Sequence, residues 1–298
     1  MEESSYREIH LLCTIELKLV IKTKIYSIFV NMEKNSILAY LYCALLTLLV
    51  VQGVSGALLT LNYIPVMENQ QAITSVKLIG STVKYGWFFQ TLHKQGVHLI
   101  VIVSLLGMVL NIRKEQITFS SLTNWWSSVM TVLFVFIAIF TGNILVGDGY
   151  ASQSFQIGGN IVKEIPLIGS IVHFLVFSPN QQELHTFSLF RMFVSHILFI
   201  PVLLGIVLLR QKPKNFREVL TPNETVVTVI IFIVLQIFLS LLLPDNDRIV
   251  PYQPDWFFLP IHFLQHQVPS MITGLLLGGI LIGMLLLPVF NRKNKNGL

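Results

Sequence analysis

The sequence predicts an all-α integral membrane protein with about six transmembrane helices. Of its 298 residues, 53% are hydrophobic and only 12% are charged, and the mean hydropathy is +0.70. A soluble domain cannot bury that much apolar surface around a single core. The apolar runs, each near the roughly 20 residues that cross about 30 Å of hydrocarbon, are 37–62, 92–112, 126–146, 190–209, 224–243 and 268–290.

The positions of the positive charges predict how these helices are oriented. Six spans place both termini on one side, together with two short loops, and this side carries most of the 20 Lys and Arg residues. Positive loops stay cytoplasmic, so both termini are expected there. The long connections 63–91, 147–189 and 244–267 are then expected to face outward. Anionic lipid beside the basic loops accounts for the net charge of +5, without nucleic acid as a partner.

Residues 1–35 form an arm that precedes the first apolar run. The arm mixes apolar residues with lysines at near-helical spacing, which predicts an amphipathic helix on the inner membrane surface. Its interrupting charges argue against a secretory signal. The alternative is that translation starts at Met32.

Two histidines stand at matching depths in the second and fourth runs. His93 and His196 both lie near the start of helices that descend from the same face. Two imidazoles that face each other across a helical bundle can hold an iron porphyrin from both sides. The alternative is two unrelated interfacial histidines, each bonded to a carbonyl or a water. His98 lies about 140° round the helix from His93 and about 7.5 Å deeper, which predicts a polar group hydrogen-bonded inside the bundle.

Five longer stretches carry a more specific pattern. They are VQGVSGALLTLNYIP at 51–65, KYGWFFQTLHKQG at 84–96, TGNILVGDGYASQSFQIGGNIVKEIPLIG at 141–169, FRMFVSH at 190–196 and PDWFFLPIHFLQHQVP at 254–269. In this order they resemble segments of cytochrome b from bc-type quinol oxidoreductase complexes. The resemblance implies a haem-binding four-helix bundle at 36–212, followed at 213–298 by two helices and a quinone-site region.

The resemblance also assigns residues to a haem. It implies that His93 and His196 bind the iron of haem b. Gly56 and Gly142 stand at the family's positions beside the outer haem, where a flat macrocycle needs residues without side chains. Gly96 is expected to keep the turn below His93 open.

Only one haem is predicted, on the outer side. Fourteen residues of helix advance about 21 Å and nearly four turns, so the ligands and glycines of an inner haem should lie 14 residues deeper. The residues at those positions are Gly107, Arg210, Tyr42 and Ser128. No histidine is available there, and a tyrosine ring fills the space that a macrocycle needs.

One propionate partner is also missing. Arg191 on the fourth helix keeps a basic residue that pairs with a haem propionate in the family. Gln90 stands where the family usually has an arginine, so the propionates lose a charge-assisted hydrogen bond.

The resemblance places a quinone site at Pro254, Asp255, Trp256 and Phe257, with Asp148 at the same outer side. Quinol oxidation releases protons, which an acidic side chain can accept, and an aromatic, proline-stiffened wall holds a flat ring. Asp255 is the expected catalytic proton acceptor. It is one methylene shorter than the glutamate usual in the family, and Phe257 lacks the hydroxyl often found there. The alternative is an aromatic belt at the membrane interface, with the aspartate as a helix cap.

The predicted function is electron exchange between a membrane quinone and the single haem. The expected partners are lipid, quinone and an extracytoplasmic redox subunit of Rieske or c type, in a multi-subunit complex of the bacterial cytoplasmic membrane for which a dimer is one option. The alternative is a redox-silent scaffold that anchors a partner complex, which Gln90, Phe257 and the missing inner ligands favour.

Overall fold

The computed structural model describes residues 34–112, 119–165, 169–177, 184–211, 220–242 and 255–293. Most of the predicted N-terminal arm and Pro254 lie outside these residues. The amphipathic-helix prediction for the arm and the quinone-site prediction for Pro254 therefore stay predictions.

All six predicted spans are long apolar helices, and the described residues contain no strand. The spans are α2 (Lys34–Thr60), α4 (Gly86–Ile112), α5 (Phe119–Ile144), the continuous helix α8 (Thr186–Val194), η2 (Ser195–Phe199) and α9 (Ile200–Gln211), then α11 (Pro222–Leu242) and α13 (Ser270–Lys293). The predicted all-α membrane fold is thus confirmed. α4 begins before its apolar run, because the helix continues through interfacial residues such as Trp87 that lower the hydropathy.

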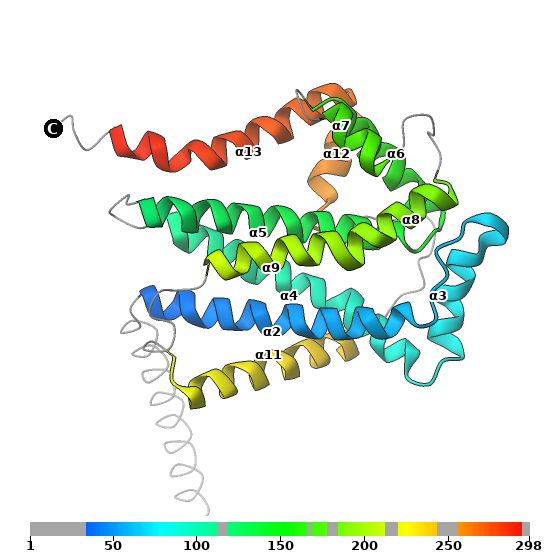
Figure 1. Ribbon diagram of the computed structural model, residues 1–298, viewed down its shortest axis with the longest axis horizontal. Coiled ribbons are helices and arrows are strands. Elements are labelled where there is room, and N and C mark those ends of the chain that lie inside the picture. The colour runs from blue at the N-terminus through cyan, green and yellow to red at the C-terminus, as the bar shows by residue number, and fades with distance from the viewer. Residues whose placement is uncertain are drawn as a thin grey trace, which may run out of the picture.

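The first four spans form the central bundle. α2 packs on α4, α4 packs on α5, and α5 packs along the α8–η2–α9 helix. The two C-terminal helices flank different members of this bundle. α11 lies along α2 and α4, whereas α13 contacts α5 and α6 (Figure 1). The bundle interior is therefore enclosed by the four helices on which the histidines and glycines stand.

Short helices cover one end of the bundle. They are η1 (Glu68–Gln70), α3 (Gln71–Ser81), α6 (Gly149–Lys163), α7 (Gly169–Val176) and α12 (Leu259–Gln267). Figure 1 shows α3, α6 and α7 together at this end. A buried apolar cluster joins them to the spans, formed by Ala72, Ile144, Ala151, Phe155, Phe177, Leu184, Leu189 and Met192. The long connections thus build a covered end, which we call the capped end.

Two contacts fasten the segment after α2 to the capped end. The Tyr63 hydroxyl donates to the Leu145 carbonyl at 2.6 Å, and burial raises the pKa of Tyr63. The Thr186 hydroxyl donates to the carboxylate of Glu68, and this hydrogen bond lowers the pKa of Glu68. The first bond joins the segment after α2 to the end of α5, and the second holds the start of the fourth span against η1.

Candidate functional site

The structure brings the two predicted histidines together. His93 on α4 and His196 in η2 have ring centroids 6.1 Å apart, with the ring planes at 79°. An iron midway between two imidazoles, with metal–nitrogen bonds of about 2 Å, holds the ring centres roughly 6 Å apart. The observed separation therefore matches a pair of axial ligands.

The hydrogen bonds of His93 determine which of its ring nitrogens carries no proton. Its Nδ1 lies 3.1 Å from the Ser55 hydroxyl, and that hydroxyl donates its own proton to the Gln52 carbonyl at 3.1 Å. Ser55 must therefore accept from His93, so Nδ1 carries the imidazole proton. The lone pair of His93 is left on Nε2, the form that binds a metal.

His196 shows the same arrangement on the other side. Its Nδ1 lies 3.0 Å from the Ala138 carbonyl and 3.1 Å from the Thr141 hydroxyl, which donates to the Ile137 carbonyl at 2.9 Å. A carbonyl only accepts, so Nδ1 of His196 is also protonated and Nε2 carries the lone pair. Ordered partners on the remote nitrogen are typical of metal-binding histidines.

The two predicted glycines lie directly against these rings. A Cβ placed on Gly56 would come 2.9 Å from Cε1 of His93, and one on Gly142 would come 2.9 Å from Cε1 of His196. The sequence suggested that these glycines make room for the macrocycle. The structure places an imidazole against each of them, where a side chain would crowd the ring, and their contact with a macrocycle stays a prediction.

Each glycine follows a hydroxyl residue, and sequence reasoning missed both hydroxyls. Ser55 precedes Gly56 on α2, and Thr141 precedes Gly142 on α5. In each pair the hydroxyl bonds the histidine that the glycine accommodates. The signal was present as a Ser/Thr–Gly dipeptide at equivalent places on two helices.

A local irregularity positions His196. η2 is a five-residue π-helical turn, whereas His93 stands in regular α-helix. A π-turn adds a residue to the helical turn and redirects the side chains around it, and such turns are frequent at functional sites. Both imidazoles are also partly accessible, so packing does not close them in.

Gly96 has a different neighbourhood from the other two glycines. A Cβ there would overlap the side-chain amides of Gln52 and Gln236. These amides donate to the carbonyls of His93 at 3.0 Å and of Leu92 at 3.4 Å. Gly96 thus leaves room for two glutamines that hold the backbone turn carrying His93.

The two residues considered for the propionates bond elsewhere. Arg191 donates to the Phe174 carbonyl at 2.9 Å, and its guanidinium lies 4.4 Å over the Phe187 ring. Gln90 donates to the Val76 carbonyl at 2.6 Å. Arg191 therefore ties the fourth span to α7, and its role toward a propionate stays a prediction.

The predicted quinone residues are divided between two places. Phe257 is buried in the bundle core, with its ring 6.0 Å from that of Phe136, while Trp256 is 49% exposed. Asp255 precedes them and is partly exposed. Asp148 instead begins α6, where its carboxylate accepts from the Ala151 amide at 2.7 Å. The structure therefore gives Asp148 a capping role, and its quinone role stays a prediction.

Among the residues that the structure describes, the other half of the bundle interior contains no histidine, and polar side chains bond to one another there. Ser128 accepts from Asn111 at 2.7 Å and from Gln211 at 3.0 Å, and Thr131 donates to Gln211 at 3.1 Å. The Tyr42 hydroxyl donates to a backbone carbonyl of α9 at 3.2 Å. Tyr42 and Ser128 thus stand at two of the positions where the glycines of an inner haem would lie, and this network ties α2, α4, α5 and α9 together.

The fold and the paired imidazoles define a class, the helical membrane proteins that hold haem between two histidines. The described residues contain no cluster of three or more His, Cys, Asp or Glu that could hold a bare metal ion. Haem needs no such cluster, because the porphyrin supplies the other ligands. The two unprotonated Nε2 atoms, on imidazoles whose positions the glycines accommodate, fit haem.

Comparison with known proteins gives the family. The family model Cytochrome b/b6/petB matches residues 29–212. The chain is 26% identical to cytochrome b of Rickettsia bellii over 272 residues, which are 80% of this chain and 67% of that protein. It is 25% identical to cytochrome b of Yarrowia lipolytica over 279 residues, 84% of this chain and 72% of that protein. The chain belongs to the cytochrome b family, which confirms the predicted family.

A solved structure supports the same fold. A chain of a hyperthermophilic respiratory Complex III superposes with a TM-score of 0.64 at 21% sequence identity, covering 84% of this chain and 75% of that chain. Family membership implies haem b binding and membrane electron transfer.

Proposed function

We propose that this protein is a membrane b-type cytochrome subunit that holds a single haem b between His93 and His196 and exchanges electrons between a quinone and that haem. The observation that carries the proposal is the facing pair of imidazoles, each with a protonated Nδ1 bonded to a hydroxyl. Bound haem b would supply a one-electron carrier at this place. Ser55 and Thr141 orient the two ligands, and Gly56 and Gly142 leave room for them.

The proposal that the bundle holds a single haem is supported by the side chains that lie deeper in the bundle than the two histidines. Tyr42 and Ser128, at the positions of the inner glycines, are buried and hydrogen-bonded. Gln211, 15 residues after His196, accepts from Thr131 and donates to Ser128. A second macrocycle between these helices would have to break this network.

Asp255 and Trp256 are the proposed quinone contacts, beside His98 on α4. Quinol oxidation releases two electrons and two protons, of which Asp255 is the proposed acceptor of one and outer-side water the acceptor of the other. The haem takes one electron at a time, and the other needs a second acceptor. We assign that role to an extracytoplasmic redox subunit of Rieske or c type.

The proposed setting is a multi-subunit, dimeric complex in a bacterial cytoplasmic membrane, with both termini cytoplasmic and the haem near the outer face. Two features support it: the basic short loops and the clustering of long connections at one end. The single haem provides no relay to the inner face, so the subunit is not expected to run a two-site quinone cycle alone.

The test measures haem b per purified polypeptide by pyridine haemochrome, then haem reduction after anaerobic mixing with a short-chain quinol. We expect one haem in the wild type, none in His93→Ala, and one in the control His185→Ala, which removes a histidine at the start of α8. Asp255→Asn should slow reduction of a retained haem. Two haems would overturn the single-haem proposal, and a well-folded protein without haem would support the scaffold instead.

A further inference from the structure

One half-buried imidazole has no part in the haem site. His98 lies five residues after His93 on α4, about 140° round the helix, so it faces away from the proposed iron. A residue that follows α11 in the chain contacts His98. The Trp256 indole donates from Nε1 to Nδ1 of His98 at 3.1 Å. The predicted internal hydrogen bond of His98 is therefore present, and its partner belongs to the proposed quinone segment.

The Trp256 bond determines which hydrogen bond His98 can still make. An indole N–H only donates, so Nδ1 of His98 must accept and carries no proton. A neutral imidazole then has its proton on Nε2, where it is a donor. Trp256 thus fixes the tautomer that presents an N–H group on the far side of the ring.

The surroundings of His98 leave this donor available. Among the described residues, no other hydrogen bond to the His98 ring is found. The ring packs 5.7 Å from Phe257, and Asp255 and Lys94 are the charged side chains that act on it. A half-buried N–H beside an aromatic wall and a carboxylate favours a ligand with an oxygen acceptor.

We propose that His98 donates a hydrogen bond from Nε2 to one ring oxygen of the quinone, while Asp255 faces the opposite oxygen. This inference rests on the proposed quinone site. The two residues have different roles, because quinone and quinol oxygens both accept from an N–H, whereas only a quinol hydroxyl can donate to the carboxylate. His98 then governs binding of both redox states, and Asp255 governs proton removal from the quinol.

The test separates binding from electron transfer. Equilibrium binding of a short-chain quinone with ¹³C-labelled carbonyls is measured on haem-loaded protein, together with the infrared carbonyl band of the bound quinone. His98→Phe, which keeps a ring but removes both nitrogens, should weaken binding about tenfold and shift the carbonyl band upward, as expected for loss of one hydrogen bond. His98→Gln can accept from Trp256 and donate to the quinone, so it should restore most of the affinity.

Two further variants separate the role of His98 from that of Asp255 and from nonspecific effects of the substitution. His185→Phe is the matched control, since it makes the same substitution away from the quinone segment, and should leave binding unchanged. Asp255→Leu, which removes the carboxylate without adding a hydrogen-bond donor, should slow haem reduction by quinol while the carbonyl band stays at its wild-type position. Unchanged affinity and an unchanged band in His98→Phe would overturn the role of His98, even where quinol still reduces the haem. Quinone binding that depends on His98 without haem reduction would overturn the electron-transfer function alone.

Discussion

The four-helix bundle has two halves with the same helices and opposite interiors. The histidine half, around His93 and His196, has a hydroxyl–glycine pair facing each imidazole. The opposite half, around Tyr42, Ser128 and Gln211, lies about 14 residues deeper along the same helices. Its equivalent positions carry hydrogen-bonded side chains. The helical period repeats the same faces in both halves. The difference therefore lies in side-chain size and bonding rather than in the path of the backbone.

The polar groups of the two halves are satisfied in different ways. In the opposite half, Asn111, Ser128, Thr131 and Gln211 bond to one another. In the histidine half, the hydrogen bonds engage Nδ1 of each imidazole and leave both Nε2 atoms without a proton. A polar network closed on itself stabilises helix packing, whereas one that leaves two facing lone pairs prepares a binding site.

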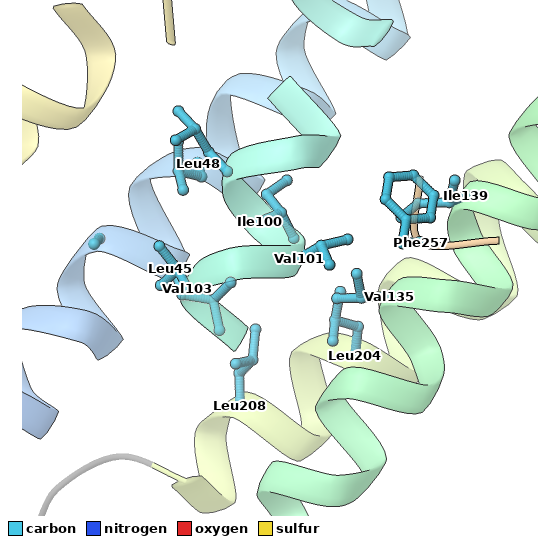
Figure 2. Close-up of a cluster of buried hydrophobic side chains, with 12 residues drawn as sticks. Leu45, Leu48, Ile100, Val101, Val103, Val135, Ile139, Leu204, Leu208 and Phe257 are labelled. Atoms are coloured by element: carbon cyan, nitrogen blue, oxygen red, sulfur yellow. The ribbon is translucent and has the colours of Figure 1, made fainter. Parts of the chain in front are cut away.

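An apolar layer separates the halves. Figure 2 shows Leu48, Ile100, Val135 and Leu204 among its members, each seven or eight residues along its helix from Ser55, His93, Gly142 and His196 respectively. At 1.5 Å per residue this places the layer roughly 11 Å below the imidazoles. Because the layer is close-packed, changes in one half are expected to leave the other half intact.

The largest expected effect comes from filling the space beside an imidazole. Gly56→Val would force the His93 ring out of line, because even a Cβ comes within 2.9 Å of it. Overpacking of about 3 kcal/mol corresponds to a loss of haem affinity of roughly 100-fold. Pyridine haemochrome on the purified variant measures this. Gly53→Val is the matched control one turn earlier, where a Cβ would meet nothing within 4 Å. Equal haem content in the two variants would contradict the role of Gly56.

The next effect removes the orienting hydroxyls. Ser55→Ala removes the hydroxyl partner of Nδ1 of His93, which should weaken haem retention about tenfold and raise the midpoint potential, since the imidazole becomes a poorer electron donor. Thr141→Val should have a smaller effect, because the Ala138 carbonyl still accepts from His196. Potentiometric titration of the haem absorbance gives the midpoint potential of each variant. A larger shift in Thr141→Val than in Ser55→Ala would contradict the compensating role of the Ala138 carbonyl.

The sequence predicted much of this comparison. Six apolar runs and the 3.6-residue period were enough to place His93 and His196 at one depth, and the 14-residue spacing pointed to Tyr42 and Ser128. These are properties of single helices, which hydropathy and periodicity capture. The family resemblance then supplied the identity of the group that two imidazoles would hold.

The parts that could not be predicted depend on contacts between distant segments. The bond from Trp256 to His98 joins residues 158 positions apart. A π-turn such as η2 has no residue signature that separates it from ordinary helix. The sequence indicated that Gly56 needed an open space, but only the packing of α2 on α4 shows that an imidazole fills it.

A change in the opposite half should affect stability without affecting haem. Ser128→Ala removes the acceptor of both Asn111 and Gln211, and leaving buried donors unpaired costs about 1–3 kcal/mol. Thermal unfolding in detergent measures the loss, with Ser127→Ala as the neighbouring control. Haem content should equal that of the wild type. Loss of haem from Ser128→Ala would show that the two halves are coupled through the apolar layer.

The smallest expected effect distinguishes Gly96 from the haem-side glycines. Its missing side chain leaves room for the amides of Gln52 and Gln236, which are the mobile ends of flexible side chains and can shift. Gly96→Ala should therefore cost less than about 1 kcal/mol in unfolding free energy and leave haem bound, because only the amide bonds to the carbonyls of Leu92 and His93 are strained.

A double-mutant cycle tests this reading of Gly96. Gln236→Ala removes one of the amides that compete with the added methyl group, so the double variant Gly96→Ala/Gln236→Ala should lose less stability than the sum of the single losses. Strictly additive losses would mean that the methyl group does not meet Gln236. If Gly96→Ala alone released haem as completely as Gly56→Val, the haem would have to extend to this turn of α4, and the boundary of the histidine half would lie one helical turn deeper than the contacts of Gln52 and Gln236 indicate.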